Sequence, residues 1–128
     1  MRARRARRIL RGDALFDVAL GALFLLAAWD GLYRALGFPP PEPAVFAEIG
    51  GVLLLGFAYL LWVAPDYTVL VRRVAEAAAM TNGITAALIA LWLASRPVGL
   101  ELLGWILAVA LIVALAAMAY LEARLTSL

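Results

Sequence analysis

Polar side chains within the long apolar runs of this 128-residue sequence are the residues that could do chemistry. The longest polar stretch, residues 72–85, reads Arg-Arg-Val-Ala-Glu-Ala-Ala-Ala-Met-Thr-Asn-Gly-Ile-Thr. A charged side chain at the centre of a membrane costs roughly 2.5–3.5 kcal/mol on insertion scales, so one that persists there is a functional hypothesis. We therefore predict an intramembrane polar site formed by Asp17, Glu76, Thr81 and Asn82.

Two of these residues also have a purely structural interpretation. Arg72 and Arg73 precede Glu76 by four and three residues, which are the spacings of ion pairs along one helix. Glu76 would then belong to a self-paired cluster at the membrane surface. Asn82 is either a ligand contact or an interhelical hydrogen-bonding group worth about 0.6–2 kcal/mol.

A second charged group is predicted at the opposite membrane surface, where Asp30, Arg34, Glu48 and Glu101 fall at one depth. Glu48 and Glu101 each lie one turn into their predicted helices, where the helix dipole stabilises a carboxylate. These residues could form an outer acidic cluster balanced by Arg34. Helix capping and side chains that reach toward the headgroups also explain each of them separately.

The remaining carboxylates are expected at helix ends, in contact with water. Asp13 stands where the N-cap of the first membrane helix belongs, and Asp17 follows one turn later near the same positive end of the dipole. Asp66 and Glu122 fall at other predicted ends. We expect these side chains to be solvated.

Cysteine and histidine are both absent from the sequence. Their absence excludes disulfides, thiol redox chemistry, the usual zinc sites and histidine-ligated haem, and it removes the commonest general base. The sequence also lacks a phosphate-binding glycine loop, a nucleophile triad and metal-ligand spacing. We predict a non-enzymatic protein with no catalytic residues, no metal and no cofactor.

The elements that must position the polar residues are membrane helices. Hydrophobic residues make up 66% of the chain, against roughly 45–50% in soluble domains. A very hydrophobic soluble oligomer is the alternative. Apolar runs predict four spans, at about 13–36, 44–64, 67–95 and 98–121, after a basic arm at 1–12 that breaks at Gly12. Short connections between them predict an all-α, antiparallel up-down four-helix bundle in one domain, residues 13–128.

Arginine placement predicts the orientation of this bundle. Nine arginines fall on the side of the N-terminus and only Arg34 and Arg96 on the other, which is a positive-inside pattern. Both termini are therefore predicted to be cytoplasmic, in a bacterial inner membrane. The basic arm is expected to contact anionic headgroups, at about 1 kcal/mol per arginine, and not to bind nucleic acid.

One segment of the second predicted helix resembles the DoxX-like small bacterial membrane proteins. The matching pattern is a glutamate, a glycine pair and a leucine-rich run, here Glu48-Ile-Gly50-Gly51-Val-Leu-Leu-Leu-Gly56. The end of the first helix departs from that family, because it has Trp29-Asp30-Gly31-Leu32-Tyr33-Arg34 where members often carry glycine and lysine. The resemblance implies a four-helix membrane subunit, linked in some members to quinone redox complexes.

Three functions follow as hypotheses. The first is a non-enzymatic accessory or subunit of a membrane complex, with the lipid bilayer and another membrane protein or a second copy as partners. The second is a small oligomeric transporter or channel that uses Asp17, Glu76 and Asn82. The third, implied by the resemblance, is a quinone- or lipid-binding, redox-associated subunit.

Overall fold

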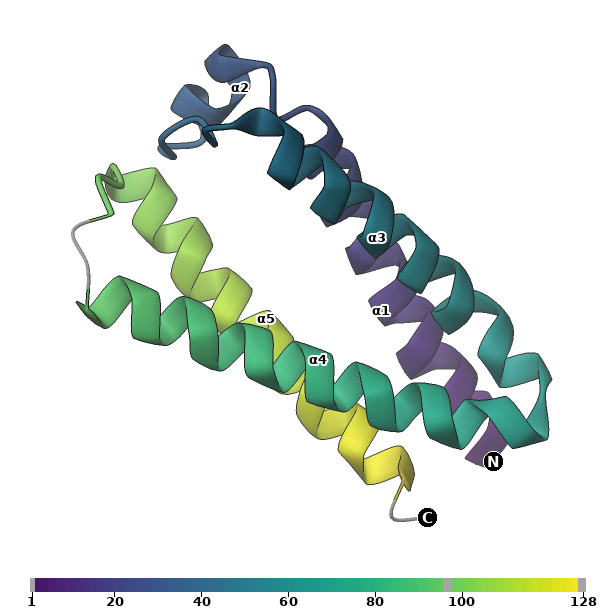
Figure 1. The fold of residues 1–128 in the computed structure, drawn as a ribbon. Helices are drawn as coiled ribbons and strands as arrows, with labels where there is room; N and C mark the ends of the chain where they lie inside the picture. Colours follow the sequence, from purple (N-terminus) through teal and green to yellow (C-terminus); the bar gives the residue numbers. More distant parts are fainter. Residues whose placement is uncertain (1, 96–97, 127–128) are drawn as a thin grey trace.

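The computed structural model describes residues 2–95 and 98–126, and every regular element in them is helical (Figure 1). In chain order the elements are α1 (Arg2–Leu25), α2 (Asp30–Ala35), α3 (Ala44–Val63), the short 3-10 helix η1 (Ala64–Asp66), α4 (Thr68–Ser95) and α5 (Leu102–Thr126). The prediction of an all-α protein is confirmed.

Three helices are long and apolar enough to cross a membrane: α3 together with η1, α4 and α5. Each exceeds the roughly 20 residues that a bilayer requires, at 23, 28 and 25 residues. The chain is therefore a membrane protein by the length and composition of its helices. The first predicted span is not among the three, because arginines occupy the first half of α1.

The basic arm is part of α1, so the predicted break at Gly12 is wrong. Arginine, alanine and leucine are strong helix formers, and one glycine does not stop such a run. Asp66 also holds the arm, because Arg7 and Arg11 form ion pairs with its two oxygens at 2.8 and 3.1 Å. The Arg11 guanidinium lies 4.8 Å from the centre of the Trp62 ring. Asp13 consequently lies inside a helix and is not an N-cap.

The end of α1 also differs from the prediction, which continued the helix to residue 36. The helix ends at Leu25, and residues 26–29 form turns that lead into α2. The Tyr33 hydroxyl donates a hydrogen bond of 2.9 Å to the carbonyl of Leu23, while the Ala27 N–H donates to Phe24 instead. The Leu23 carbonyl thus accepts from the Tyr33 hydroxyl and from the Leu26 N–H, at 3.1 Å, and the next helical hydrogen bond, from Ala27, is not formed.

The other helices begin and end near their predicted positions, except α5. It starts four residues later than predicted and ends five residues later. Residues 98–101, before it, have no regular secondary structure, and Gly99 among them has a positive φ of 60°. Glu101 therefore precedes α5, and its backbone N–H donates a 3.0 Å hydrogen bond to the carbonyl of Gly37.

The four long helices form two helical hairpins, because α1 packs along α3 and α4 packs along α5. The α1–α3 hairpin closes at Gly21 and Gly51, where a Cβ atom on Gly51 would lie 2.7 Å from the Gly21 carbonyl oxygen. The two backbones therefore approach closely at Gly51. They do not at Gly56, where such a Cβ has no atom within 4 Å.

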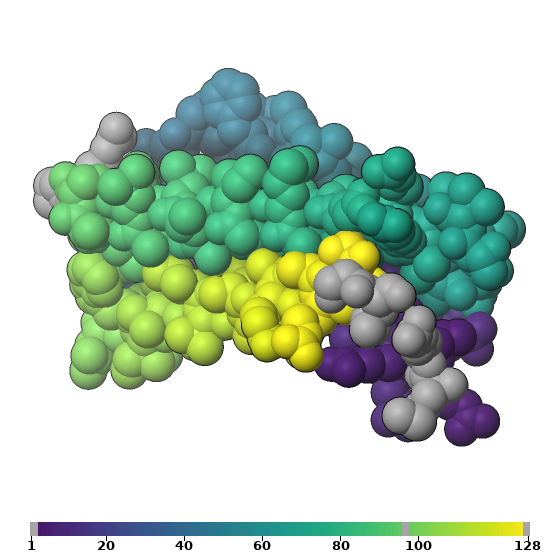
Figure 2. Space-filling model, turned by 90° about the horizontal axis from the view of Figure 1, so that it is seen from below, coloured from purple at the N-terminus to yellow at the C-terminus, as the bar shows by residue number. Residues whose placement is uncertain are grey.

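The two hairpins converge toward the end that holds both termini, here called the terminal end (Figures 1 and 2). Figure 2 shows α4 and α5 side by side, with the first part of α1 beside the last part of α5. The core lies here, formed by Leu10, Ala14, Ala58, Leu61, Ala75 and Ala78. Toward the opposite end, the loop end, the hairpins diverge (Figure 1). A closely packed four-helix bundle is therefore not confirmed.

At the loop end, Gly37 is in close contact with the other hairpin. Gly37 has a positive φ of 79°, which only glycine adopts readily. Its backbone packs directly on Gly104, because a Cβ on Gly37 would lie 2.5 Å from the Gly104 nitrogen. The hairpins are thus joined at both ends, with space between them.

Candidate functional site

The side-chain amide of Asn82 links the two hairpins by hydrogen bonds. The Asn82 Nδ2 atom, at the middle of α4, donates hydrogen bonds of 3.0 Å to Asp13 Oδ2 on α1 and of 3.0 Å to Glu122 Oε2 on α5. An asparagine amide carries two donor hydrogens, so both are used. We call these three residues the Asn82 clasp.

The clasp is buried and has more acceptors than donors. Asp13 and Glu122 are each 0% exposed and Asn82 is 4% exposed. The second oxygens of the two carboxyl groups, Asp13 Oδ1 and Glu122 Oε1, have no hydrogen-bond partner within residues 2–95 and 98–126. A buried acceptor without a partner costs roughly 1–3 kcal/mol, and more if it is charged. The clasp can therefore accept further hydrogen bonds or positive charge.

Asp17 lies one turn along α1 from the clasp. It is 3% exposed, and it lines a cavity of about 430 Å³ with Thr81, Asn82 and Thr85 of α4. No other part of the described chain donates a hydrogen bond to its carboxylate. The remaining walls of this cavity are apolar, from α1, α3, α4 and α5. Among the described residues, Asp17 is the one charged residue in its wall.

A larger apolar cavity adjoins this one on the side of the loop end. Its volume is about 580 Å³, and both cavities share the wall residues Leu20, Phe24, Ile89 and Leu111. Tyr33 and Trp92 line it as well, and Glu42 near the mouth is its one charged wall residue among those described. Sites for small molecules typically have volumes of about 300–1,000 Å³, apolar walls and a few polar groups. The two cavities together have this character.

The structure brings together three of the four residues of the predicted intramembrane site. Asp17, Thr81 and Asn82 line the same cavity. Glu76 lies elsewhere, because its carboxylate pairs with Arg72 at 3.1 Å and with Arg73 at 3.0 Å on the exposed side of α4. The ion-pair interpretation of Glu76 is therefore the one that the structure supports.

Two residues of the clasp were expected at solvated helix ends, and that expectation is wrong. Asp13 and Glu122 are both fully buried. The sequence does hold a signal for Asp13, because it lies four residues before Asp17 and hence on the same helical face. Glu122 has no such signal, since its burial depends on how the hairpins meet.

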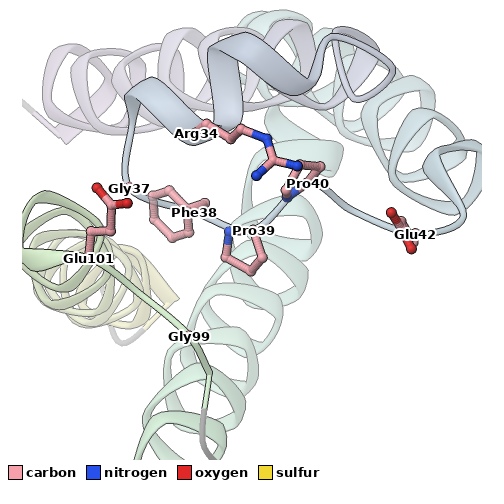
Figure 3. Close-up of a pocket in the computed structure, with 8 residues that line it drawn as sticks. All are labelled: Arg34, Gly37, Phe38, Pro39, Pro40, Glu42, Gly99 and Glu101. Atoms are coloured by element: carbon pink, nitrogen blue, oxygen red, sulfur yellow. The ribbon is translucent and has the colours of Figure 1, made fainter.

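The predicted outer cluster is not assembled. Arg34, Glu42 and Glu101 line a separate pocket of about 580 Å³ at the loop end. Figure 3 shows the side chains of Arg34, Glu42 and Glu101 standing apart. Asp30 and Glu48 do not line this pocket, and no ion pair joins any of the four predicted residues in the described ranges. Arg96, predicted for this side, lies outside the described residues.

Among the described residues, no group of three or more histidine, cysteine or acidic side chains could hold a metal ion. In comparisons with known proteins, no family model, curated protein or solved structure matches the chain. The resemblance to DoxX-like proteins stays a prediction. The argument for function therefore depends on the site itself.

Proposed function

We propose that this chain is a small bacterial inner-membrane protein that binds an amphipathic molecule between its two helical hairpins. The observation that carries the proposal is an apolar cavity that ends at the buried side chains of Asp17 and Asn82. Apolar walls would hold the body of the molecule, and the polar end would orient its head. This develops the quinone- or lipid-binding hypothesis from the sequence.

The proposed topology has four crossings, with the second half of α1 as the first. The terminal end is placed in the cytoplasm, because the arginines of α1 together with Arg72, Arg73 and Arg124 lie toward it. The clasp and cavities would then lie within the bilayer. There, water cannot satisfy buried polar groups, so a ligand head at Asp17 would do so.

The proposed function can be tested with a variant whose larger side chain fills the cavity. Leu111 lines both cavities, so Leu111→Trp should block the space that they share. Val113, on the same helix, is 62% exposed and faces outward, so Val113→Trp is the matched control. Protein purified in mild detergent would be extracted and its small amphipathic molecules measured by mass spectrometry.

We expect the wild type and Val113→Trp to retain the same amphipathic compound in near-stoichiometric amount. Leu111→Trp should retain at least about tenfold less of this compound. Equal retention by Leu111→Trp and Val113→Trp would contradict binding in the cavity. A wild type that retains only bulk lipid in the ratio of the membrane would contradict it as well.

The other two hypotheses stay predictions. For an accessory role in a membrane complex, the described residues indicate no specific contact surface. The exposed apolar side chains of α3, such as Phe46 and Leu53, suit lipid or protein neighbours equally. A transporter that uses Glu76 is less favoured, because Glu76 is paired with arginines away from the cavity.

A further inference from the structure

We propose that the molecule held between the hairpins carries a positively charged, hydrogen-bond-donating amine, which the Asp17 carboxylate receives at the deep end of the cavity. The inference rests on the proposed function and names the chemical class of its ligand. It is argued from the charge, the unsatisfied acceptors and the shape of this region.

Charge is the first step. Asp13, Asp17 and Glu122 are each at most 3% exposed and surround one neutral amide. No basic side chain lines either interhelical cavity among the described residues. Two arginines earlier on α1, Arg7 and Arg11, pair with Asp66 instead. Whichever of these carboxyl groups is ionised has no basic partner in the cavities, so the site favours a cation and disfavours an anion.

The second step concerns acceptor atoms that lack a hydrogen-bond donor, and it does not depend on net charge. Asp13 Oδ1 and Glu122 Oε1 are buried without a donor in the described part of the chain. The Asn82 amide already donates both of its hydrogens, to Asp13 Oδ2 and to Glu122 Oε2. Asp17, which lines the cavity beside Asn82, likewise receives no hydrogen bond from the described chain, and a protonated primary amine bound in the cavity would offer it up to three donor hydrogens.

Shape is the third step. The way to Asp17 leads along apolar side chains, including Phe24, Ile89 and Leu111. A hydrated inorganic cation gains nothing from such walls, whereas an amine on an apolar body fits both the walls and the carboxylate. The cavity volumes of about 430 and 580 Å³ suit a single small molecule.

The test compares three probes of one length that differ only in the head group: octylamine, octanol and octanoate. Each would be titrated calorimetrically into the full chain in nanodiscs of zwitterionic lipid, with empty nanodiscs subtracted. We expect octylamine to bind at least about tenfold more tightly than octanol, because charged hydrogen bonds contribute roughly 1.5–3 kcal/mol. Octanoate should bind more weakly than octanol.

Substitutions then locate the amine. Asp17→Asn keeps the shape of the side chain and should weaken octylamine binding at least about tenfold, while octanol binding, which reports an intact cavity, stays the same. Glu76→Gln, outside the cavity, should leave octylamine binding unchanged. Glu42→Gln tests the other charged wall residue, where the proposal places no amine.

The possible results separate the two proposals. Equal affinity for octylamine and octanol in the wild type would overturn the cationic class and leave the cavity function standing. A loss of octylamine binding in Glu42→Gln but not in Asp17→Asn would overturn the assignment to Asp17. Binding of none of the three probes would overturn the proposed function as well.

Discussion

At the scale of single residues, the small side chain of Asn82 connects the two hairpins. Its two donor hydrogens are shared between a carboxylate of the first hairpin and a carboxylate of the second. Removing the amide would leave two fully buried carboxyl groups without any donor in the described chain. Loss of one partner of a buried polar group costs more than the bond itself contributes.

We therefore expect Asn82→Leu to lower the free energy of unfolding by roughly 2–5 kcal/mol. The neighbouring Thr81 is exposed and forms no hydrogen bond with another described side chain, so Thr81→Val is the matched control, with an expected change under about 0.5 kcal/mol. Thermal unfolding in detergent, followed by circular dichroism, measures both. Similar melting temperatures for the two variants would contradict the role of the clasp.

At the scale of the elements, the hairpin of α1 and α3 depends on one crossing point. Gly21 and Gly51 bring the two backbones so close that a methyl group at Gly51 would lie 2.7 Å from a carbonyl oxygen. Backbone atoms cannot move aside as a flexible side chain does. The helices would have to separate locally, which would loosen the contacts of both.

Gly51→Ala should therefore lower the free energy of unfolding by roughly 1–3 kcal/mol, the usual cost of overpacking. Gly56→Ala in the same helix should raise it by up to about 1 kcal/mol, because alanine is the better helix former and nothing lies within 4 Å of the new methyl group. Opposite shifts in melting temperature are the expected result. A shift in the same direction for both would show that the crossing does not limit packing.

Sequence patterns predicted the elements better than their junctions. The limits of α3 and α4 follow from apolar run length and from Pro43 and Pro65, which interrupt helices. Residues 26–29, Leu-Ala-Ala-Trp, contain no glycine or proline, so nothing local predicts the end of α1. That end depends on the hydroxyl of Tyr33, ten residues away from its acceptor.

The same difference applies to the residues of the site, of which the sequence predicted some and not others. Asn82 and Asp17 were predicted because polar groups in apolar runs are conspicuous. Asp13 and Glu122 were missed, because both lie near charged segments that look solvated, and only the packing of one hairpin against the other buries them. Glu76 was included because its depth along the helix resembled that of a buried residue, but arginines one turn away satisfy it.

At the scale of the whole molecule, the arginine distribution leads to a prediction about topology. The natural sequence has no cysteine, so single-cysteine variants can be labelled with a membrane-impermeant maleimide. Arg5 and Ala35 are both exposed, near opposite ends of the molecule. In spheroplasts we expect Ala35→Cys to react at once and Arg5→Cys only after permeabilisation, because the terminal end should be cytoplasmic. The reverse order would contradict the orientation.

The position of the clasp along the chain has a consequence for biosynthesis. Asp13 is made early, Asn82 well after the first hairpin is complete, and Glu122 only in the last turns of α5. Segments of a chain generally fold in the order in which they leave the ribosome. The first hairpin must therefore enter the membrane with a carboxyl group whose partner does not yet exist, and it stays in that condition until α4 brings Asn82; α5 then completes the clasp with Glu122. Assembly of this protein would end, rather than begin, with its most buried polar contact.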